Sequence, residues 1–273
     1  MIRLSQVSRR FIEALVSREA GSAATEYNEP GSAIWQRTGF MHRQRYAFAA
    51  RRITGKRVLN VACGPGYAEP MLLMGHPASV VAVDYDIDLI ARLQAQSEAP
   101  PSHVEYMHAN AEALPDALGK FDVIISFENI EHLRSPELLL EGVRRLAKSD
   151  AKLILSTPNR MKYSDHPDQP YKNPFHVREY SFGELTALLT PYLTNIEYFG
   201  QVERNYIGLA NEIEAALRSL NSLWIVRVER AVRRFIGKPA RAFDFLSFET
   251  DLLPISAEVC NDVDTFVVIG TVR

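Results

Sequence analysis

A glycine turn after an apolar run is the first feature of this sequence that could do chemistry. The stretch 58–67 reads VLNVACGPGY and contains Gly64 and Gly66, which lack a Cβ and let the backbone approach a ligand closely. Asp84 follows at the end of the next apolar run, where its carboxylate could accept hydrogen bonds from ribose hydroxyls. Glu69 stands where a dinucleotide fingerprint has its third glycine, and it would repel a pyrophosphate. The pattern therefore predicts a ligand that joins a nucleoside to a positively charged centre.

Acidic and imidazole side chains gather after a later apolar run, in the sequence FENIEH at 127–132. A helical turn would bring Glu128, Glu131 and His132 to one side. That set could hold a hard divalent cation, or present His132 as a general base beside an orienting carboxylate. His176, in a proline-containing loop further on, could complete the metal set or act as the base itself. The alternatives are solvated helix-start residues for Glu131 and His132, and a plain surface histidine for His176.

Two further positions flank these motifs. Asn110 ends a third apolar run, and its amide could bond an adenine edge or simply form an Asx turn. Arg45 and Tyr46 precede the first strand in a short predicted helix that could fold over the ligand. Packing in the core is the alternative for Tyr46.

Alternating apolar runs and helical patterns must position these residues. Strands are expected at 57–63, 79–85, 104–110, 121–127, 151–157, 195–201 and 265–272. Helices are expected near 67–75, 87–96 and 136–147. Ser135 is expected to cap the third of these helices, and Ser181 with Glu184 forms a capping-box pattern at the start of another. Regular β–α alternation predicts an α/β, doubly wound sheet with its ligands at the carboxyl ends of the strands.

Composition places the chain among ordinary globular proteins. It has 273 residues, 47% hydrophobic and 23% charged, and a net charge of −2 that gives no basic field for nucleic acid. The two cysteines, Cys63 and Cys260, lie far apart, which argues against a disulfide framework and fits a reducing compartment. The first twenty residues lack an apolar block long enough for a signal peptide or membrane span. A cytoplasmic location is expected.

The expected organisation has four parts. They are an N-terminal helical cap (1–50), a ligand-binding core (51–203), a helical insertion or substrate cap (204–262) and a final core strand (263–273). A long helix expected at about 209–236 carries a basic face formed by Arg227, Arg230, Arg233 and Arg234. This face could touch a membrane or an anionic substrate, but a lid or dimer helix with a solvated face is favoured.

Taken together, these segments resemble class I S-adenosylmethionine-dependent methyltransferases over about residues 40–200. The resemblance rests on the glycine turn, Asp84, the 110–112 turn, FDVIISFE at 121–128 and STPN at 156–159. It implies a mostly parallel, seven-stranded Rossmann-like sheet with the last strand antiparallel, and S-adenosylmethionine as cofactor. The cofactor-binding residues that it implies are Tyr46, Asn60, Ala62, Gly64, Gly66, Asp84, Tyr85, Asn110, Ala111, Glu112 and Phe127.

Two narrower resemblances concern the acceptor and a metal. RYAFA at 45–49 and NPFHVRE at 173–179 resemble bacterial sugar O-methyltransferases of polysaccharide and O-antigen gene clusters. The Glu-x-x-Glu-His pattern with a later histidine resembles small-RNA ribose O-methyltransferases, in which the corresponding side chains bind a divalent cation. That likeness implies Mg²⁺ or Mn²⁺ held by Glu128, Glu131, His132 and His176. Asn60 and Asn110 depart from the family pattern, because each replaces an acidic residue and loses its charge.

The sequence therefore predicts an S-adenosylmethionine-dependent O-methyltransferase that acts on a sugar, a glycan or a related hydroxylated metabolite. His132 and His176 are its candidate catalytic residues. The alternatives are an RNA ribose or other small-molecule methyltransferase, and a cofactor-binding scaffold without catalysis. The sequence does not identify the methyl acceptor, the need for a metal or the oligomeric state. A homodimer and peripheral contact with a membrane are both compatible with it.

Overall fold

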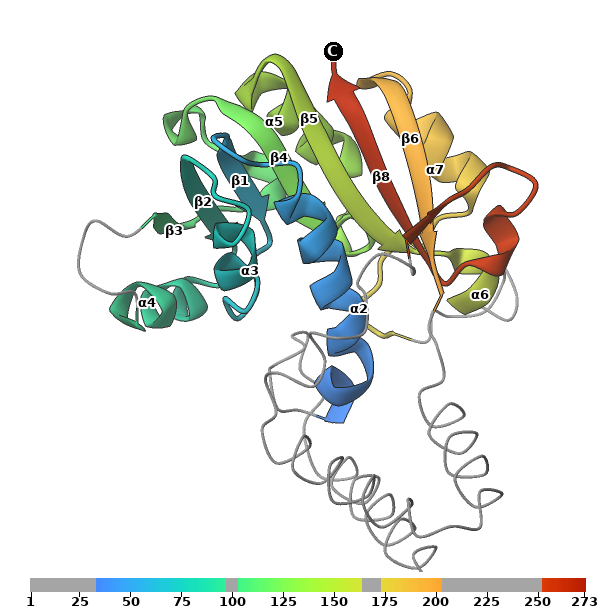
Figure 1. Ribbon diagram of the computed structural model, residues 1–273, viewed down its shortest axis with the longest axis horizontal. Helices are drawn as coiled ribbons and strands as arrows, with labels where there is room; N and C mark the ends of the chain where they lie inside the picture. The colour runs from blue at the N-terminus through green and yellow to red at the C-terminus, as the bar shows by residue number, and fades with distance from the viewer. Residues whose placement is uncertain (1–32, 97–102, 164–172, 203–251) are drawn as a thin grey trace, which may run out of the picture.

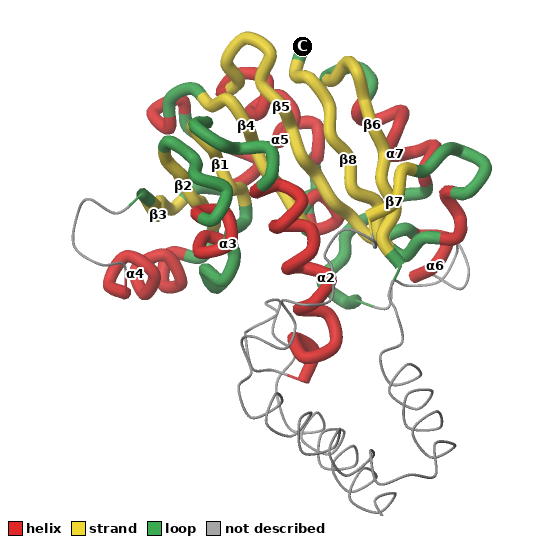
Figure 2. Tube along the Cα trace, in the orientation of Figure 1, coloured by secondary structure: helices red, strands yellow, loops and turns green. Residues whose placement is uncertain are grey.

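The computed structural model describes residues 33–96, 103–163, 173–202 and 252–273. They form one eight-stranded sheet with helices on both faces (Figures 1 and 2). The predicted helix at 209–236 and its basic face lie outside the described residues, as does most of the expected N-terminal cap. Within the described ranges, no helix is long and apolar enough to cross a membrane.

The sheet has the strand order β3-β2-β1-β4-β5-β8-β6-β7. The strands are β1 Arg57–Val61, β2 Ser79–Asp84, β3 Val104–His108, β4 Phe121–Phe127, β5 Ala147–Pro158, β6 Leu193–Gln201, β7 Leu252–Pro254 and β8 Thr265–Val272. Strands β1 to β5 pair in parallel, whereas β8 is antiparallel to both β5 and β6. The doubly wound fold and the antiparallel last strand are confirmed. The expected count of seven strands is one too few, because the short β7 pairs with the outer edge of β6.

The order of the strands places the ligand edge. Strand β1 pairs with β2 on one side and with β4 on the other. The chain winds outward from β1 to β3 and then crosses back to β4, so the winding reverses between β1 and β4. In open α/β sheets, ligands bind at the carboxyl ends of the strands beside such a reversal.

Helices cover the sheet according to the alternation of side chains along each strand. They are α2 Ala33–Ala50, α3 Glu69–Leu73, α4 Ile87–Gln96, α5 Pro136–Leu146, α6 Arg160–Tyr163 and α7 Phe182–Leu189. Val81 and Val83 of β2 share a core cluster with Leu139 of α5, while Val80 shares another with Leu72 of α3. Helices α2 and α3 therefore lie on one face and α5 and α7 on the other (Figure 1).

Helix starts test two local predictions. Helix α7 begins with the predicted capping box: Ser181 Oγ accepts from the Glu184 N–H, and Glu184 Oε2 accepts from the Ser181 N–H at 2.8 Å. The predicted cap at Ser135 is wrong, because its side chain makes no capping hydrogen bond to α5. Its own N–H instead donates to Glu112 Oε1. That contact ties the start of α5 to the loop after β3.

Candidate active site

The glycine turn follows β1 and needs unusual backbone angles. Ala62, Gly64 and Gly66 all have positive φ, at 57°, 57° and 80°. A Cβ added at Gly64 would meet no atom within 4 Å, whereas one at Gly66 would collide with Leu93 of α4. Gly64 therefore leaves the backbone open to a ligand, and Gly66 allows the turn to pack against α4.

Asp84 holds this turn from the end of β2. Its side chain is buried, at 2% exposure. The Gly64 N–H donates to Asp84 Oδ2 at 3.0 Å, and the Asp86 N–H donates to Oδ1 at 3.1 Å. The carboxylate thus fixes the turn at the position predicted for ribose binding, and the ribose contact itself stays a prediction. Tyr85, the next residue of the predicted set, is 54% exposed beside it.

Asn60 and Glu69 form a buried pair under the turn. Asn60 Nδ2 donates to Glu69 Oε1 at 2.8 Å, and the two residues are 0% and 1% exposed. Burial raises the pKa of Glu69 to about 7, although the hydrogen bond from Asn60 works in the opposite direction. The residue that argued against a pyrophosphate is thus a carboxyl group of the core that titrates near neutral pH.

This raised pKa predicts a pH-dependent stability. Because Glu69 has a pKa of about 7 in the folded state and an ordinary value of 4.5, the folded state binds the extra proton between these values. The stabilisation is complete below the ordinary pKa and is lost as the pH rises through about 7. Relative to Glu69→Gln, the wild type should lose up to ~3 kcal/mol of unfolding free energy across this window. Urea unfolding of both proteins at about pH 5 and pH 8 measures the difference; an equal gap at both pH values would contradict it.

The loop after β3 forms the Asx turn that was the alternative reading of Asn110. Asn110 Oδ1 accepts from the Glu112 N–H at 2.9 Å and caps a short 3₁₀ turn, Ala111–Ala113. Ala111 is buried in the core cluster, and Glu112 braces the start of α5. These residues shape the edge of the site, and an adenine contact from Asn110 stays a prediction.

Helix α2 crosses over the ligand edge and brings aromatic side chains to it. The Tyr46 ring packs edge-on against Phe127 at 4.9 Å and against Tyr67 at 5.8 Å, between ring centroids. His42 Nδ1 and the Tyr67 hydroxyl are hydrogen-bonded at 2.8 Å. Burial, and then the charge of Arg45, lower the pKa of His42 well below its usual value. Tyr46 and Phe127 of the predicted cofactor set thus meet beside the glycine turn.

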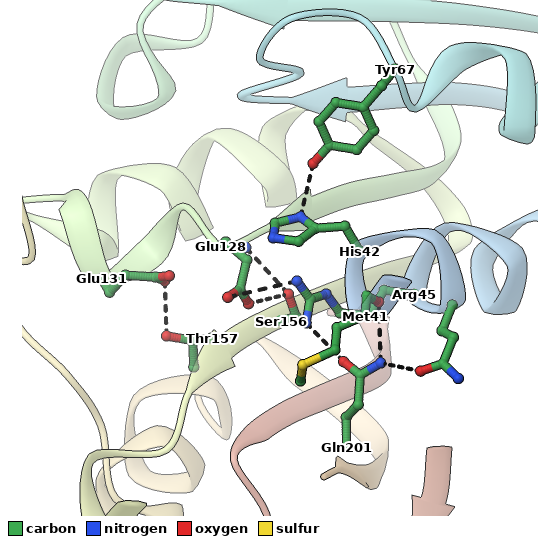
Figure 3. Close-up of polar contacts among 10 residues, drawn as sticks. Met41, His42, Arg45, Tyr67, Glu128, Glu131, Ser156, Thr157 and Gln201 are labelled. Atoms are coloured by element: carbon green, nitrogen blue, oxygen red, sulfur yellow. Dashed lines mark hydrogen bonds and ion pairs between the residues drawn. The ribbon is translucent and has the colours of Figure 1, made fainter. Parts of the chain in front are cut away.

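Glu128 departs from the predicted metal set. Figure 3 shows its carboxylate directed toward Arg45 and Ser156. Ser156 Oγ donates to Glu128 Oε1 at 2.8 Å, and Arg45 Nη2 lies 3.7 Å from Oε2. The expected shared side of a helical turn fails because Glu128 has a φ of 49° and the 3₁₀ turn begins only at Ile130. Arg45 in turn donates to Gln201 at 2.8 Å and so links α2 to β6.

The other three members of the predicted set come together. Glu131, His132 and His176 each offer a ligand atom, and these atoms lie within 4.8 Å of one another. Glu131 is fully buried: Oε2 accepts from Thr157 Oγ1 at 2.9 Å, and Oε1 has no hydrogen-bond partner among the described residues. Burial, and then the charge of Glu128, raise the pKa of Glu131 well above its usual value. The structure thus brings one acidic and two imidazole groups into one cluster.

Both histidines are held through their Nδ1 atoms. His132 Nδ1 lies 3.1 Å from the Phe175 carbonyl oxygen, which can only accept, so this nitrogen donates. His176 Nδ1 lies 2.7 Å from Glu179 Oε1, and Glu179 is fully buried. When a ring that donates through Nδ1 is neutral, its lone pair lies at Nε2. Glu179 was not predicted as a site residue. Its spacing of three residues from His176 was the signal that could have identified it.

Comparisons with known proteins identify a methyltransferase domain in this chain. Residues 58–150 match the family model described as "Methyltransferase domain". A "Probable S-adenosylmethionine-dependent methyltransferase" of Mycobacterium tuberculosis is 36% identical over 148 residues, or 54% of this chain. The aligned part spans about half of that relative, 52% of its length. A protein of Mycolicibacterium smegmatis whose name begins in the same way is 30% identical over 223 residues, 82% of this chain and 83% of its own length.

Other similarities concern smaller parts of the chain or the fold alone. A ubiquinone biosynthesis O-methyltransferase of Ruegeria is 35% identical over 107 residues, 39% of this chain and 42% of that protein. Among solved structures, a SAM-dependent methyltransferase of Thermotoga maritima superposes with a TM-score of 0.54 at 15% identity. The superposition covers 87% of this chain and 91% of that one. At this identity the likeness is one of fold.

Proposed function

Because the chain belongs to the S-adenosylmethionine-dependent methyltransferases, we propose that it methylates a hydroxyl oxygen of a sugar, a glycan or a related hydroxylated metabolite. The observation that carries this proposal is the pair of imidazoles whose Nδ1 atoms donate to the protein, His132 and His176. Their Nε2 atoms can take a proton from a hydroxyl. The similarity to proteins named ubiquinone biosynthesis O-methyltransferases also favours oxygen as the methylated atom.

S-Adenosylmethionine fits the residues at the turn. The open space beside Gly64 leaves room for a ligand against the backbone. Asp84 offers a carboxylate for the ribose at the end of β2. A ligand that begins there and crosses the sheet reversal brings its sulfonium toward the end of β4, where the Glu131, His132 and His176 cluster begins.

The chemical step is an in-line displacement. The acceptor oxygen bonds to the methyl carbon while the carbon–sulfur bond breaks. The electron pair of the breaking bond stays on sulfur, and S-adenosylhomocysteine forms. A hydroxyl is a weak nucleophile near neutral pH, so its proton must leave as the new bond forms. Without a bound cation, His176 Nε2 takes that proton, and the Glu179 carboxylate orients the ring and stabilises the imidazolium.

A divalent cation would be held by Glu131, His132 and His176. The residues fit this role, because Glu131 Oε1 lacks a hydrogen-bond partner in the described chain. Two imidazoles and one carboxylate suit Mn²⁺ better than Mg²⁺, which prefers oxygen ligands. When bound, the cation would polarise the acceptor hydroxyl and stabilise the developing alkoxide.

Labelled cofactor tests the proposal. The protein is incubated with ¹³C-methyl S-adenosylmethionine and a set of neutral glycosides, amino sugars and short RNAs. We expect the label as an oxygen-bound methyl on a glycoside, identified by its carbon chemical shift. Chelation should lower the rate by about 100-fold and Mn²⁺ should restore it.

Each of the other possible outcomes would contradict one part of the proposal. Label on the nitrogen of an amino sugar would contradict an oxygen acceptor, and label on RNA ribose would replace the glycan by a nucleic acid. Full activity after chelation would show that no cation is needed, and His176 would then be the base. Cofactor binding without transfer to any of these acceptors would favour the scaffold alternative.

A further inference from the structure

Two arginines stand two residues beyond the two histidines of the proposed site. Arg134 follows His132, and Arg178 follows His176. Their loops are joined through the backbone, because the Glu131 carbonyl oxygen accepts from the Arg178 N–H at 3.0 Å. Three residues span at most about 10 Å, so the Arg134 backbone lies no further than this from the Glu131 position that binds Arg178. The two arginines therefore flank one edge of the site.

Neither guanidinium forms an ion pair with a carboxylate in the part of the chain that the structure describes, and both side chains are exposed. Three other arginines of these ranges do form such pairs: Arg144 with Glu141, Arg145 with Asp116, and Arg160 with Glu184. A guanidinium presents a planar fork of N–H donors, which matches two oxygens of a carboxylate or phosphate. Arg134 and Arg178 thus offer two such forks to a ligand.

Arg178 is also held in place before a ligand arrives. Its guanidinium carbon lies 5.2 Å from the centroid of the Tyr180 ring, and that ring is fully buried. The cation–π contact orders the side chain, and the hydrogen bond to Glu131 fixes the backbone. A side chain that is already ordered loses less entropy on binding. Arg178 is therefore better prepared for an anion than a freely solvated arginine.

The neighbouring carboxylates do not neutralise this edge. Glu131 and Glu179 are fully buried, and Glu179 already faces His176 Nδ1 at 2.7 Å. The chain as a whole has a net charge of −2, so the positive charge here is local. A carboxylate has one charge and two oxygens, which suit a single fork. A phosphate group has nearly two charges and three free oxygens, and can contact two forks at once.

We propose that Arg134 and Arg178 bind a phosphate group of the acceptor, so that the preferred substrate is a phosphorylated sugar. This inference rests on the proposed function, because it names the class of sugar that is methylated at the same site. A free sugar phosphate, a nucleotide sugar and a lipid-linked sugar phosphate all carry this group. The histidines act on the hydroxyl, whereas the two arginines hold the phosphate and determine specificity.

Acceptors that differ only in the phosphate test this directly. A panel of methyl glycosides is compared with the 1-phosphates of the same sugars, with ¹³C-methyl S-adenosylmethionine as donor. The wild type should have a kcat/KM about 10- to 100-fold higher for the phosphate. Arg178→Gln should lose most of that preference, and Arg134→Gln combined with Arg178→Gln should lose all of it. Uridine-diphosphate and polyprenyl-phosphate derivatives of the same sugars then identify the source of the phosphate.

The ratio between the two acceptors in one preparation guards against a folding defect, because inactive protein lowers both rates alike. Arg92→Gln, which removes an exposed arginine of α4, should leave this ratio unchanged. Equal kcat/KM values for both acceptors in the wild type, or a preference that survives in the double variant, would overturn the phosphate receptor and leave the proposed function intact. If no acceptor of either kind is methylated, the proposed function fails, and the receptor with it.

Discussion

His176→Ala is expected to lower the rate of methyl transfer by about 1,000-fold, the usual worth of a well-placed general base. His176 holds its lone pair at Nε2 because Nδ1 faces the buried Glu179 carboxylate at 2.7 Å. Without a cation, the variant loses the proton acceptor; with a cation bound, it loses one of the three side chains that would hold it, beside Glu131 and His132. Single-turnover kinetics with labelled cofactor measure the step, and titration with S-adenosylhomocysteine should give a nearly unchanged affinity.

Two further variants separate this role from a structural one. Glu179→Gln keeps the hydrogen bond to His176 but loses its charge, so it should reduce the rate less and shift the pH–rate profile. His103→Ala removes a histidine that is exposed just before β3 and should have no effect. Wild-type turnover in His176→Ala would exclude this residue as the base.

Asp84→Ala should produce the largest loss of cofactor affinity, about 100-fold or more for S-adenosylhomocysteine and 5′-methylthioadenosine alike. The carboxylate accepts from the Gly64 N–H at 3.0 Å, and in the proposed complex it also accepts from the ribose. The variant therefore loses the ligand contact and the restraint on the turn. Isothermal titration measures both affinities, and thermal unfolding reports the second effect.

The comparison between ligands is informative here. Asp84 acts on the adenosine end that both ligands share, so selective loss of S-adenosylhomocysteine alone would contradict its assignment. Asp84→Asn keeps an acceptor oxygen for Gly64 and should recover stability more fully than affinity. If the Asp84→Ala protein bound both ligands as tightly as the wild type does, the proposed ribose contact would be excluded.

Much of the fold could be predicted because its signals are local. The strands are apolar runs between turns, and the capping box at Ser181 depends only on a residue three positions away. The cap at Ser135 failed, and the contact that its N–H makes instead is with Glu112 of another loop, which the local pattern does not contain. The short β7 was missed because it has only three residues and no alternation of its own.

The site was predictable as a set of residues but not as a geometry. The orientation of Glu128 depends on a left-handed backbone angle and on Arg45, and neither follows from its spacing to Glu131. Arg45 and Gln201 are 156 residues apart and meet only when α2 packs across β6. The burial of Glu69 likewise depends on the packing of α3 against α2 and β2. These contacts are long-range, so the local pattern could not contain them.

We propose that one site holds adenosine at Asp84 and directs the sulfur toward the imidazoles of His132 and His176. A crystal structure of the complex with S-adenosylhomocysteine tests it most directly. We expect the ribose hydroxyls on the Asp84 carboxylate and the sulfur facing the two Nε2 atoms. A ribose bound elsewhere, or a sulfur directed away from that cluster, would contradict it.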